Sequence, residues 1–307
     1  MIIVARIILF VLLLLFVNNA HASSDLKIDV IPELWHAYWW ANTDFGLKEK
    51  PLVNYSIAPS LIAGSQLGLS KADIKFLLRF FIGENDLKDV VASLILPTFV
   101  IDDMSVEITT RKGQRHGTVS QTQGTQIINS GDKSTILTYQ NQTMAFQAKW
   151  RETAIALFYA DSQGLISKAG FKYLHREQQI PLAIAKYTGV VNTSNYQYIA
   201  RNVTLYDAQM NSNIGLIIGE MQIAYWKANA SFGFGTTQIL IPGQQEEYIS
   251  TALLESEIQY SVPTRLTQIE AGIRGGIEAI IRAPQTRQDY LAGINTYYLG
   301  PFIRCRF

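Results

Sequence analysis

The chain has 307 residues, 48% of them hydrophobic and 17% charged, and a formal net charge of +1. Such a balance excludes a disordered chain, and the lack of any basic run excludes a typical nucleic-acid-binding protein. The length is enough for one large domain or two ordinary ones.

The first residues have the three-part pattern of a secretory signal. Arg6 precedes an unbroken apolar run over residues 7–17, and Ala20-His21-Ala22 supplies small residues at the cleavage positions. The pattern predicts cleavage after Ala22. A membrane anchor is the weaker alternative, because a helix over this run reaches only ~17 Å of the ~30 Å that a membrane requires. We therefore expect residues 1–22 to be removed and residues 23–307 to form one exported domain.

The cysteine content limits how the exported chain is stabilised. Cys305 is the only cysteine, so no internal disulfide is possible even in an oxidising compartment. No cysteine directly follows the cleavage site, which argues against a lipid anchor. Stability must therefore come from packing and closure.

Apolar residues then alternate with polar ones along most of the chain. The period of two indicates strands that are apolar on one face and polar on the other, and no run approaches the ~18 apolar residues of a membrane-spanning helix. The candidate strands are 26–40, 53–69, 74–82, 104–108, 118–128, 135–149, 153–160, 166–175, 198–206, 219–225, 231–241, 251–262, 269–282 and 296–307. These segments predict about fourteen strands, with twelve to sixteen left open.

The segment 269–282 also permits a helix, because its charged residues are four apart and would form ion pairs on one helical face. Against this, Gly272, Gly275 and Gly276 would each cost a helix interior about 1 kcal/mol. The apolar residues also recur at every second position. We therefore favour a strand.

The last stretch carries a resemblance to a known class. Tyr297, Leu299, Ile303 and Phe307 lie on one side of an extended chain, and Arg304 and Arg306 lie on the other. The stretch resembles the closing strand of Gram-negative outer-membrane β-barrels, which ends on an aromatic residue. The resemblance implies a transmembrane antiparallel up-and-down barrel in the outer membrane. Its partners would be outer-membrane lipid, periplasmic chaperones and the barrel-assembly machinery, which would recognise the four apolar residues. A soluble protein that ends in an amphipathic strand is the alternative.

The location of the strands decides which face lies inside. In lipid an unpaired backbone group costs several kcal/mol, so the sheet must close, with its apolar face outward and its polar face toward the lumen. A soluble barrel would show the same alternation. Aromatic residues near strand ends favour the membrane, because they are typical of interfacial girdles; they are Trp35, Tyr38, Trp39, Trp40, Tyr225, Trp226, Tyr297 and Tyr298.

The connections give a second prediction. With both termini periplasmic, every second turn should be short. The candidate short turns are 69–72, 112–115, 151–152, 227–229 and 263–264, whereas 178–197 is long where it should be short.

One segment predicts a short helix in a loop. Over residues 86–96, Leu87, Val90, Val91 and Leu94 share one helical face, and Asp86 would cap the helix. Such a helix would narrow the pore or rest on the rim.

The charged residues on the polar faces are the candidate pore lining, because rings of charge set ion preference in channels. They are Lys75, Arg79, Glu270, Arg274, Glu278, Arg282, Arg304 and Arg306. The alternative is that opposite charges on neighbouring strands pair and brace the barrel.

No catalytic, metal or cofactor site is predicted, since His36, His116 and His175 stand apart without ligand neighbours. His116 and Thr118 would share one face of a strand, which faintly resembles the arrangement in outer-membrane phospholipases. Asp102-Asp103 faintly resembles the acidic residues of outer-membrane aspartyl-type proteases. In both cases the rest of the motif is missing. We expect a channel for small solutes or ions. A rim enzyme acting on lipid or peptide and a closed structural or adhesive barrel are the alternatives.

Overall fold

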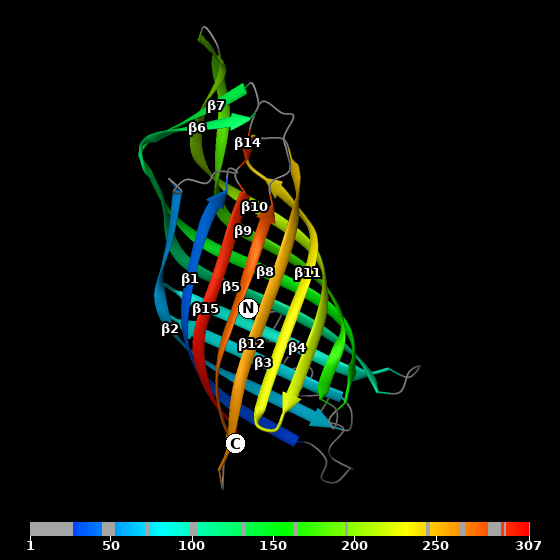
Figure 1. The fold of residues 1–307 in the computed structure, drawn as a ribbon. Coiled ribbons are helices and arrows are strands. Elements are labelled where there is room, and N and C mark those ends of the chain that lie inside the picture. Colours follow the sequence, from blue (N-terminus) through cyan, green and yellow to red (C-terminus); the bar gives the residue numbers. More distant parts are fainter. Residues whose placement is uncertain are drawn as a thin grey trace.

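A computed structural model describes residues 27–44, 53–71, 74–98, 103–130, 133–161, 165–193, 196–243, 246–264, 268–281, 290–291 and 293–306 (Figure 1). Every regular element in these ranges is a strand. The strands are β1 Lys27–Asp44, β2 Val53–Lys71, β3 Ile74–Gly83, β4 Leu87–Pro97, β5 Met104–Gln121, β6 Gly124–Ser130, β7 Lys133–Tyr139, β8 Gln142–Ala160, β9 Ile166–Thr193, β10 Tyr196–Ile223, β11 Trp226–Leu240, β12 Glu247–Pro263, β13 Gln268–Ile281, β14 Tyr290–Leu291 and β15 Gly293–Arg306. The proposed signal, residues 1–22, and the terminal Phe307 lie outside the described residues.

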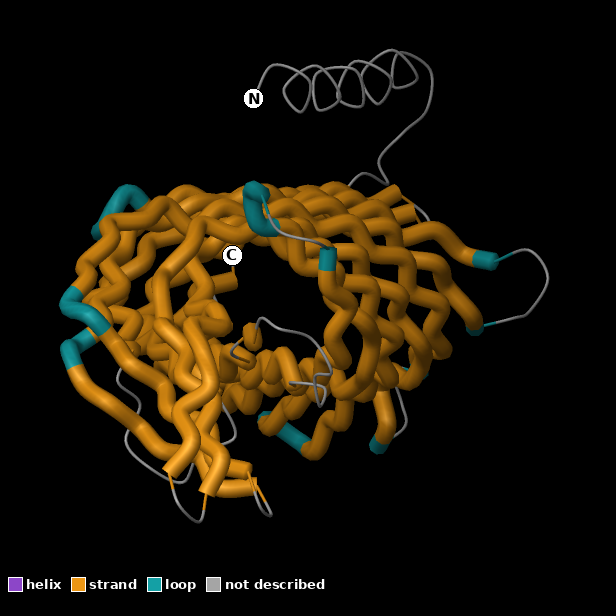
Figure 2. Tube along the Cα trace, turned by 90° about the horizontal axis from the view of Figure 1, so that it is seen from above, coloured by secondary structure: helices purple, strands orange, loops and turns teal. Residues whose placement is uncertain are grey.

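Twelve of the fifteen strands form a closed antiparallel barrel, because β6, β7 and β14 lie outside the wall. The wall runs β1, β2, β3, β4, β5, β8, β9, β10, β11, β12, β13 and β15, and β15 pairs with β1 to close it (Figures 1 and 2). The predicted closure is confirmed. The expected count of fourteen strands is wrong for the wall. The wall has twelve strands, the lowest number in the predicted range of twelve to sixteen.

The outer face of the barrel is apolar and the inner face polar, as predicted. On β13, Ile273 and Ile277 are 56% and 40% exposed, whereas the side chain of Arg274 between them is 14% exposed. No helix in the described part of the chain is long and apolar enough to cross a membrane.

Aromatic residues border the apolar outer face at both ends of the strands. Trp40 stacks on Tyr297 at one end, with ring centroids 5.4 Å apart, and Trp226 contacts Tyr260 near the β10–β11 turn at the other. This is the arrangement of interfacial girdles. Trp35, Trp39 and Tyr298 do not belong to it, because they project inward.

The predicted helix over 86–96 is wrong, because these residues form β4. The strand begins after a tight turn in which Asn85 and Asp86 have φ of 56° and 54°. Paired left-handed residues of this kind set the twist that a hairpin needs, and Asn and Asp tolerate them. Val90 and Val91 also favour a strand through their branched side chains.

The turns predicted at 112–115 and 151–152 are also wrong, because both sets of residues lie in the middle of long strands. β5 and β8 have 18 and 19 residues and pair along their whole length. The long connection predicted at 178–197 is instead the upper part of β9 and the start of β10, which have 28 residues each.

These two strands outgrow the barrel at one end. β8 pairs with β9 only as far as Gln179, and β11 pairs with β10 only from Gln209 onward. Between these points β9 and β10 pair with each other and form a two-stranded ribbon, residues 180–193 and 196–208, that rises above the wall (Figure 1). β14 pairs with the β9 edge of the ribbon, and β7 pairs in parallel with its β10 edge.

Candidate functional site in the barrel lumen

The lumen contains most of the charged residues that the sequence singled out. The residues that project inward are Arg79, Glu270, Arg274, Glu278, Arg304 and Arg306. All except Arg79 form ion pairs inside the lumen, and Arg79 interacts electrostatically with carboxylates that pair with Arg274 and Arg304. Lys75 lies on the same face of β3 but is exposed near its end, and the side chain of Arg282 is outside the described residues.

One group of charges joins neighbouring strands on one side of the lumen. Arg304 on β15 donates to Glu33 on β1 at 2.7 Å and to Glu257 on β12 at 2.9 Å. Arg274 on β13 pairs with the same two carboxylates. Glu270, whose side chain is only 4% exposed, lies 3.6 Å from Arg306. Two arginines therefore share two glutamates, so neither charge is left alone in a poorly hydrated space.

A second group crosses the lumen. The guanidinium of Arg176 on β9 lies 2.8 Å from Glu152 on the adjacent strand and 3.0 Å from Glu278 on β13. Three strands of the wall separate β9 from β13, so the second contact spans the interior. The Arg176 side chain is 7% exposed. The lumen is therefore bridged by side chains at this level.

Arg111 extends the second group toward β4. Its guanidinium donates to both carboxylate oxygens of Asp89, from Nη2 to Oδ2 at 2.7 Å and from Nε to Oδ1 at 3.0 Å and to Oδ2 at 2.9 Å. Its atom Nη1 lies 3.5 Å from Glu152. Trp150 packs beside this pair, and its ring nitrogen donates to Asp89 at 3.3 Å. The bidentate geometry fixes the orientation of the guanidinium.

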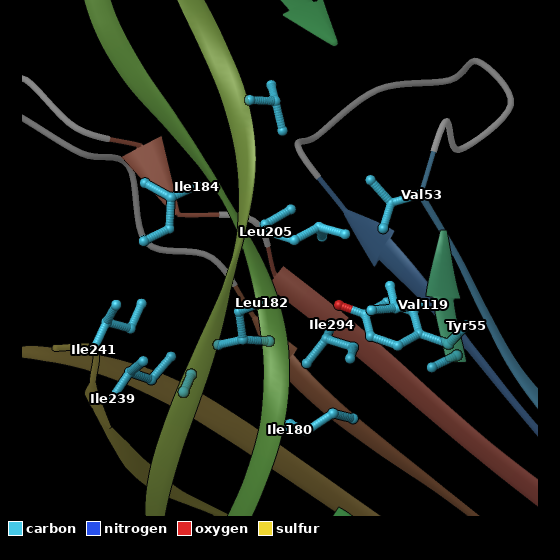
Figure 3. Close-up of a cluster of buried hydrophobic side chains, with 14 of the residues drawn as sticks. Val53, Tyr55, Val119, Ile180, Leu182, Ile184, Leu205, Ile239, Ile241 and Ile294 are labelled. Carbon is cyan, nitrogen blue, oxygen red and sulfur yellow. The ribbon is translucent and has the colours of Figure 1, made fainter. Parts of the chain in front are cut away.

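Above the charged groups, the lumen becomes apolar. Residues 180–185 of the ribbon are buried on both faces, with Leu182 at 1% and Ala183 at 0% exposure. They join an apolar cluster to which β1, β2, β5, β7, β8, β11, β12, β13 and β15 also contribute (Figure 3). We call this cluster the apolar plug. The Tyr55 hydroxyl of β2 donates to the carbonyl of Pro181 at 2.8 Å, which fixes the ribbon to the rim.

Several of the lumen residues lie outside the strands that the sequence predicts. Arg111 and Glu152 were assigned to or beside turns, and Asp89 was assigned to the helix. Arg176 falls next to the segment that was interpreted as a long connection. Each of these residues lies on the inward face of its own strand. If the predicted strands were extended to their observed lengths, the alternation would place all of them inside.

The residues considered for enzyme chemistry do not gather into a site. His116 projects from the outer face of β5 and lies 3.9 Å from Asp86, with Thr118 further along the same face. Asp103 is in the turn before β5, and Asp102 is outside the described residues. Among the described residues, no group of three or more His, Cys, Asp or Glu side chains is placed to hold a metal ion.

A closed antiparallel barrel with apolar residues outside, aromatic girdles and charges inside is a β-barrel of the outer-membrane type. No protein-family model and no curated protein sequence matches the chain. Similar solved structures include the Pseudomonas putida toluene transporter TodX (6% identical, 93% of this chain and 90% of that chain covered, TM-score 0.36). Others are the translocator domain of the autotransporter NalP from Neisseria meningitidis (9%, 99% and 96%, 0.37) and the outer-membrane protease OmpT from Escherichia coli (8%, 94% and 99%, 0.30).

Proposed function

We propose that the protein is an outer-membrane channel for small solutes or ions that is closed in the described conformation. The observation that carries the proposal is that the apolar plug includes a ribbon which has left the barrel wall. A closure made by such a segment is separable from the wall, because the twelve-stranded ring of hydrogen bonds does not depend on residues 180–208.

The chemistry of the two layers supports a gated path. A constriction lined by apolar side chains blocks ions by excluding water, and it opens when it widens or becomes polar. Beneath it, the charged groups of β1, β12, β13 and β15 would face any solute that passes. The group of charges that joins these strands has as many carboxylates as guanidinium groups. An ion pair in it can therefore exchange partners without any change in the net charge of the lumen.

Planar-bilayer recording tests the proposal with two deletions of the ribbon. In the first, residues 181–207 are replaced by Asn-Gly, which removes the part of the ribbon that enters the plug. In the second, residues 188–200 are replaced by Asn-Gly, which shortens only the tip and keeps Leu182 and Leu205. Heat-modifiable gel mobility and strand content by circular dichroism establish that both variants fold as barrels.

We expect the wild type and the tip deletion to be silent or to open rarely, and the 181–207 deletion to give discrete, frequent conductance. A milder version, Leu182→Asp with Leu205→Asp, should also raise the opening frequency by hydrating the plug. Silence of the folded 181–207 deletion at all voltages would overturn the channel.

That outcome would favour the second candidate, a closed structural barrel. The observation behind it is the bridge from Arg176 to Glu278, which crosses the lumen beneath the plug with both side chains at 10% exposure or less. A structural barrel predicts a membrane-integrity defect on deletion of the gene and no conductance from any ribbon variant.

A further inference from the structure

A groove crosses the outer surface of the barrel on the side of β5, β8, β9 and β10. Its volume is about 830 Å³. It is lined by three successive residues from each strand, such as Lys112 to Gln114 on β5 and Lys149 to Arg151 on β8. The middle residue of each set, Gly113 or Trp150, projects into the lumen, and the two flanking residues project outward. The groove therefore lies on the outside, with backbone as its floor and two rows of side chains as its walls.

The β5–β8 half of the groove carries three cations close together. Lys112 is directly opposite Arg151 in the antiparallel register, and Lys149 is the next outward residue along β8. All three are exposed. Like charges directly opposite each other destabilise a pair of strands. None of the three has an ion-pair partner among the described residues.

The other half of the groove carries carboxylates, but these have partners of their own. Glu177 lies 3.7 Å from the ring of His175, and Asp207 accepts a hydrogen bond from Gln179 at 2.8 Å. Glu246 accepts one from Gln238 at 2.8 Å. Although Arg151 faces Glu177 across the β8–β9 register, the pair does not form. The groove is therefore divided into a cationic half on β5 and β8 and an anionic half on the far side, formed by β9, β10 and the β11–β12 connection.

The apolar residues below these cations on β8 indicate how far above the hydrocarbon layer the cations lie. Ile155, Leu157 and Tyr159 project outward from β8 and are 53%, 42% and 40% exposed. Ile155 lies four positions after Arg151, which is about 13 Å along a strand and about 10 Å along the axis of a barrel with strands tilted by ~40°. The headgroup layer is about 5–8 Å thick on each side of the hydrocarbon, and long cationic side chains reach back toward it.

We propose that this groove is a binding site for the phosphate of a lipid in the surrounding leaflet, held by Lys112, Lys149 and Arg151. A phosphate at this position neutralises the repulsion between Lys112 and Arg151 and accepts hydrogen bonds from all three side chains. The acyl chains of the same lipid then lie along Ile155, Leu157 and Tyr159. The site depends on the barrel being in a membrane but not on its being a channel.

Native mass spectrometry of the full barrel, released from uncharged detergent micelles, tests the site. The micelles contain lipid A with its two phosphates or the same lipid with the phosphates removed, and a third arm contains inorganic phosphate alone. The variant is Lys112→Gln, Lys149→Gln, Arg151→Gln. The matched control, Lys112→Arg, Lys149→Arg, Arg151→Lys, keeps every charge, and Lys27→Gln removes one at the opposite end of the barrel.

We expect the wild type and both controls to retain phosphorylated lipid A and to lose the dephosphorylated lipid. The triple Gln variant should bind phosphorylated lipid A about 100-fold more weakly, which corresponds to about 3 kcal/mol at about 1 kcal/mol per cation near an anionic surface. Equal binding by the folded triple Gln variant would overturn the site. So would equal retention of the dephosphorylated lipid, or saturation by inorganic phosphate alone, which would indicate a site for free anions.

Discussion

Replacement of Arg176 by methionine tests the role of the ion pairs that cross the lumen. Methionine keeps most of the length of the side chain but removes the charge that lies between Glu152 and Glu278. Both carboxylates are poorly hydrated, at 13% and 10% exposure. Loss of one partner from such a buried group typically costs ~3–5 kcal/mol, because the remaining charges stay in place without compensation.

The expected loss is at the lower end of this range, about 3 kcal/mol. Glu152 keeps Arg111 at 3.5 Å, and Glu278 keeps the amide of Gln178 at 3.1 Å, so neither carboxylate is left wholly alone. Addition of Glu278→Gln removes one of the two carboxylate charges that lose Arg176 as their partner. The double variant should therefore be more stable than the sum of the single losses by about 1–2 kcal/mol.

Equilibrium unfolding in urea, in detergent micelles and followed by tryptophan fluorescence, gives these free energies from the midpoint and slope. Arg151→Met serves as the control, because Arg151 is an exposed arginine on the outer face of the adjacent strand, and its loss should change stability by no more than about 0.5 kcal/mol. If Arg176→Met unfolds at the wild-type midpoint, or if the two substitutions simply add, the bridge does not hold the barrel together.

Four further outcomes follow from the structure and the sequence. A Cβ at Gly235 would lie 1.9 Å from the carbonyl oxygen of Asn213, so Gly235→Ala should cost about 2 kcal/mol in the same urea assay, whereas Gly189→Ala, with nothing within 4 Å, should be neutral. In the 181–207 deletion, Arg274→Glu should shift the reversal potential toward cation preference, and an unchanged potential would place Arg274 off the path. N-terminal sequencing of the exported protein should begin at Ser23, and detection of residues 1–22 would refute cleavage. The hydrogen bond from Lys88 lowers the pKa of Asp86, so the contribution of this turn to stability should be complete at neutral pH and disappear only as the pH falls through that lowered pKa; the carboxyl NMR signal of Asp86 measures it.

The sequence predicted the barrel well where the strands face hydrocarbon. On β13 and β15 the outward positions are apolar, aromatic or small and the inward positions are polar, aromatic or glycine, apart from Ile280 near the end of β13 and Ile294 and Asn295 at the start of β15. The alternation alone therefore gives both strand and orientation. The same regularity predicted that Arg274 and Arg304 lie inside. Their shared carboxylate Glu33 was visible as a polar-face residue of the first strand, but its pairing required the register between β1 and β15.

The failures lie where a strand leaves the apolar zone. Lys112 and Arg151 are outward residues, yet they are charged because the wall there continues past the apolar belt, so the alternation disappears although the strand does not. This loss of contrast produced the false turns and the wrong strand count. At residues 86–96 apolar residues fall on both faces of β4, which is also the pattern of a helix. The Asn85-Asp86 turn and the branched side chains of Val90 and Val91 are what favour the strand.

The apolar plug was the least predictable part of the lumen. In residues 180–185 every side chain is buried, so no polar face exists to mark the strand. The period-two rule assumes one buried and one exposed face, and it fails where a ribbon passes between other elements.

The orientation of the two faces of the barrel is the claim on which the membrane location, the lumen and the lipid site all depend. Nitroxide labels placed singly at 273, 274, 277 and 278 of β13, in a Cys305→Ser background reconstituted in lipid vesicles, measure it through collision with oxygen, which concentrates in hydrocarbon. We expect high oxygen accessibility at 273 and 277 and low accessibility at 274 and 278. Equal accessibility along the strand, or the opposite alternation, would contradict a barrel whose apolar face meets lipid.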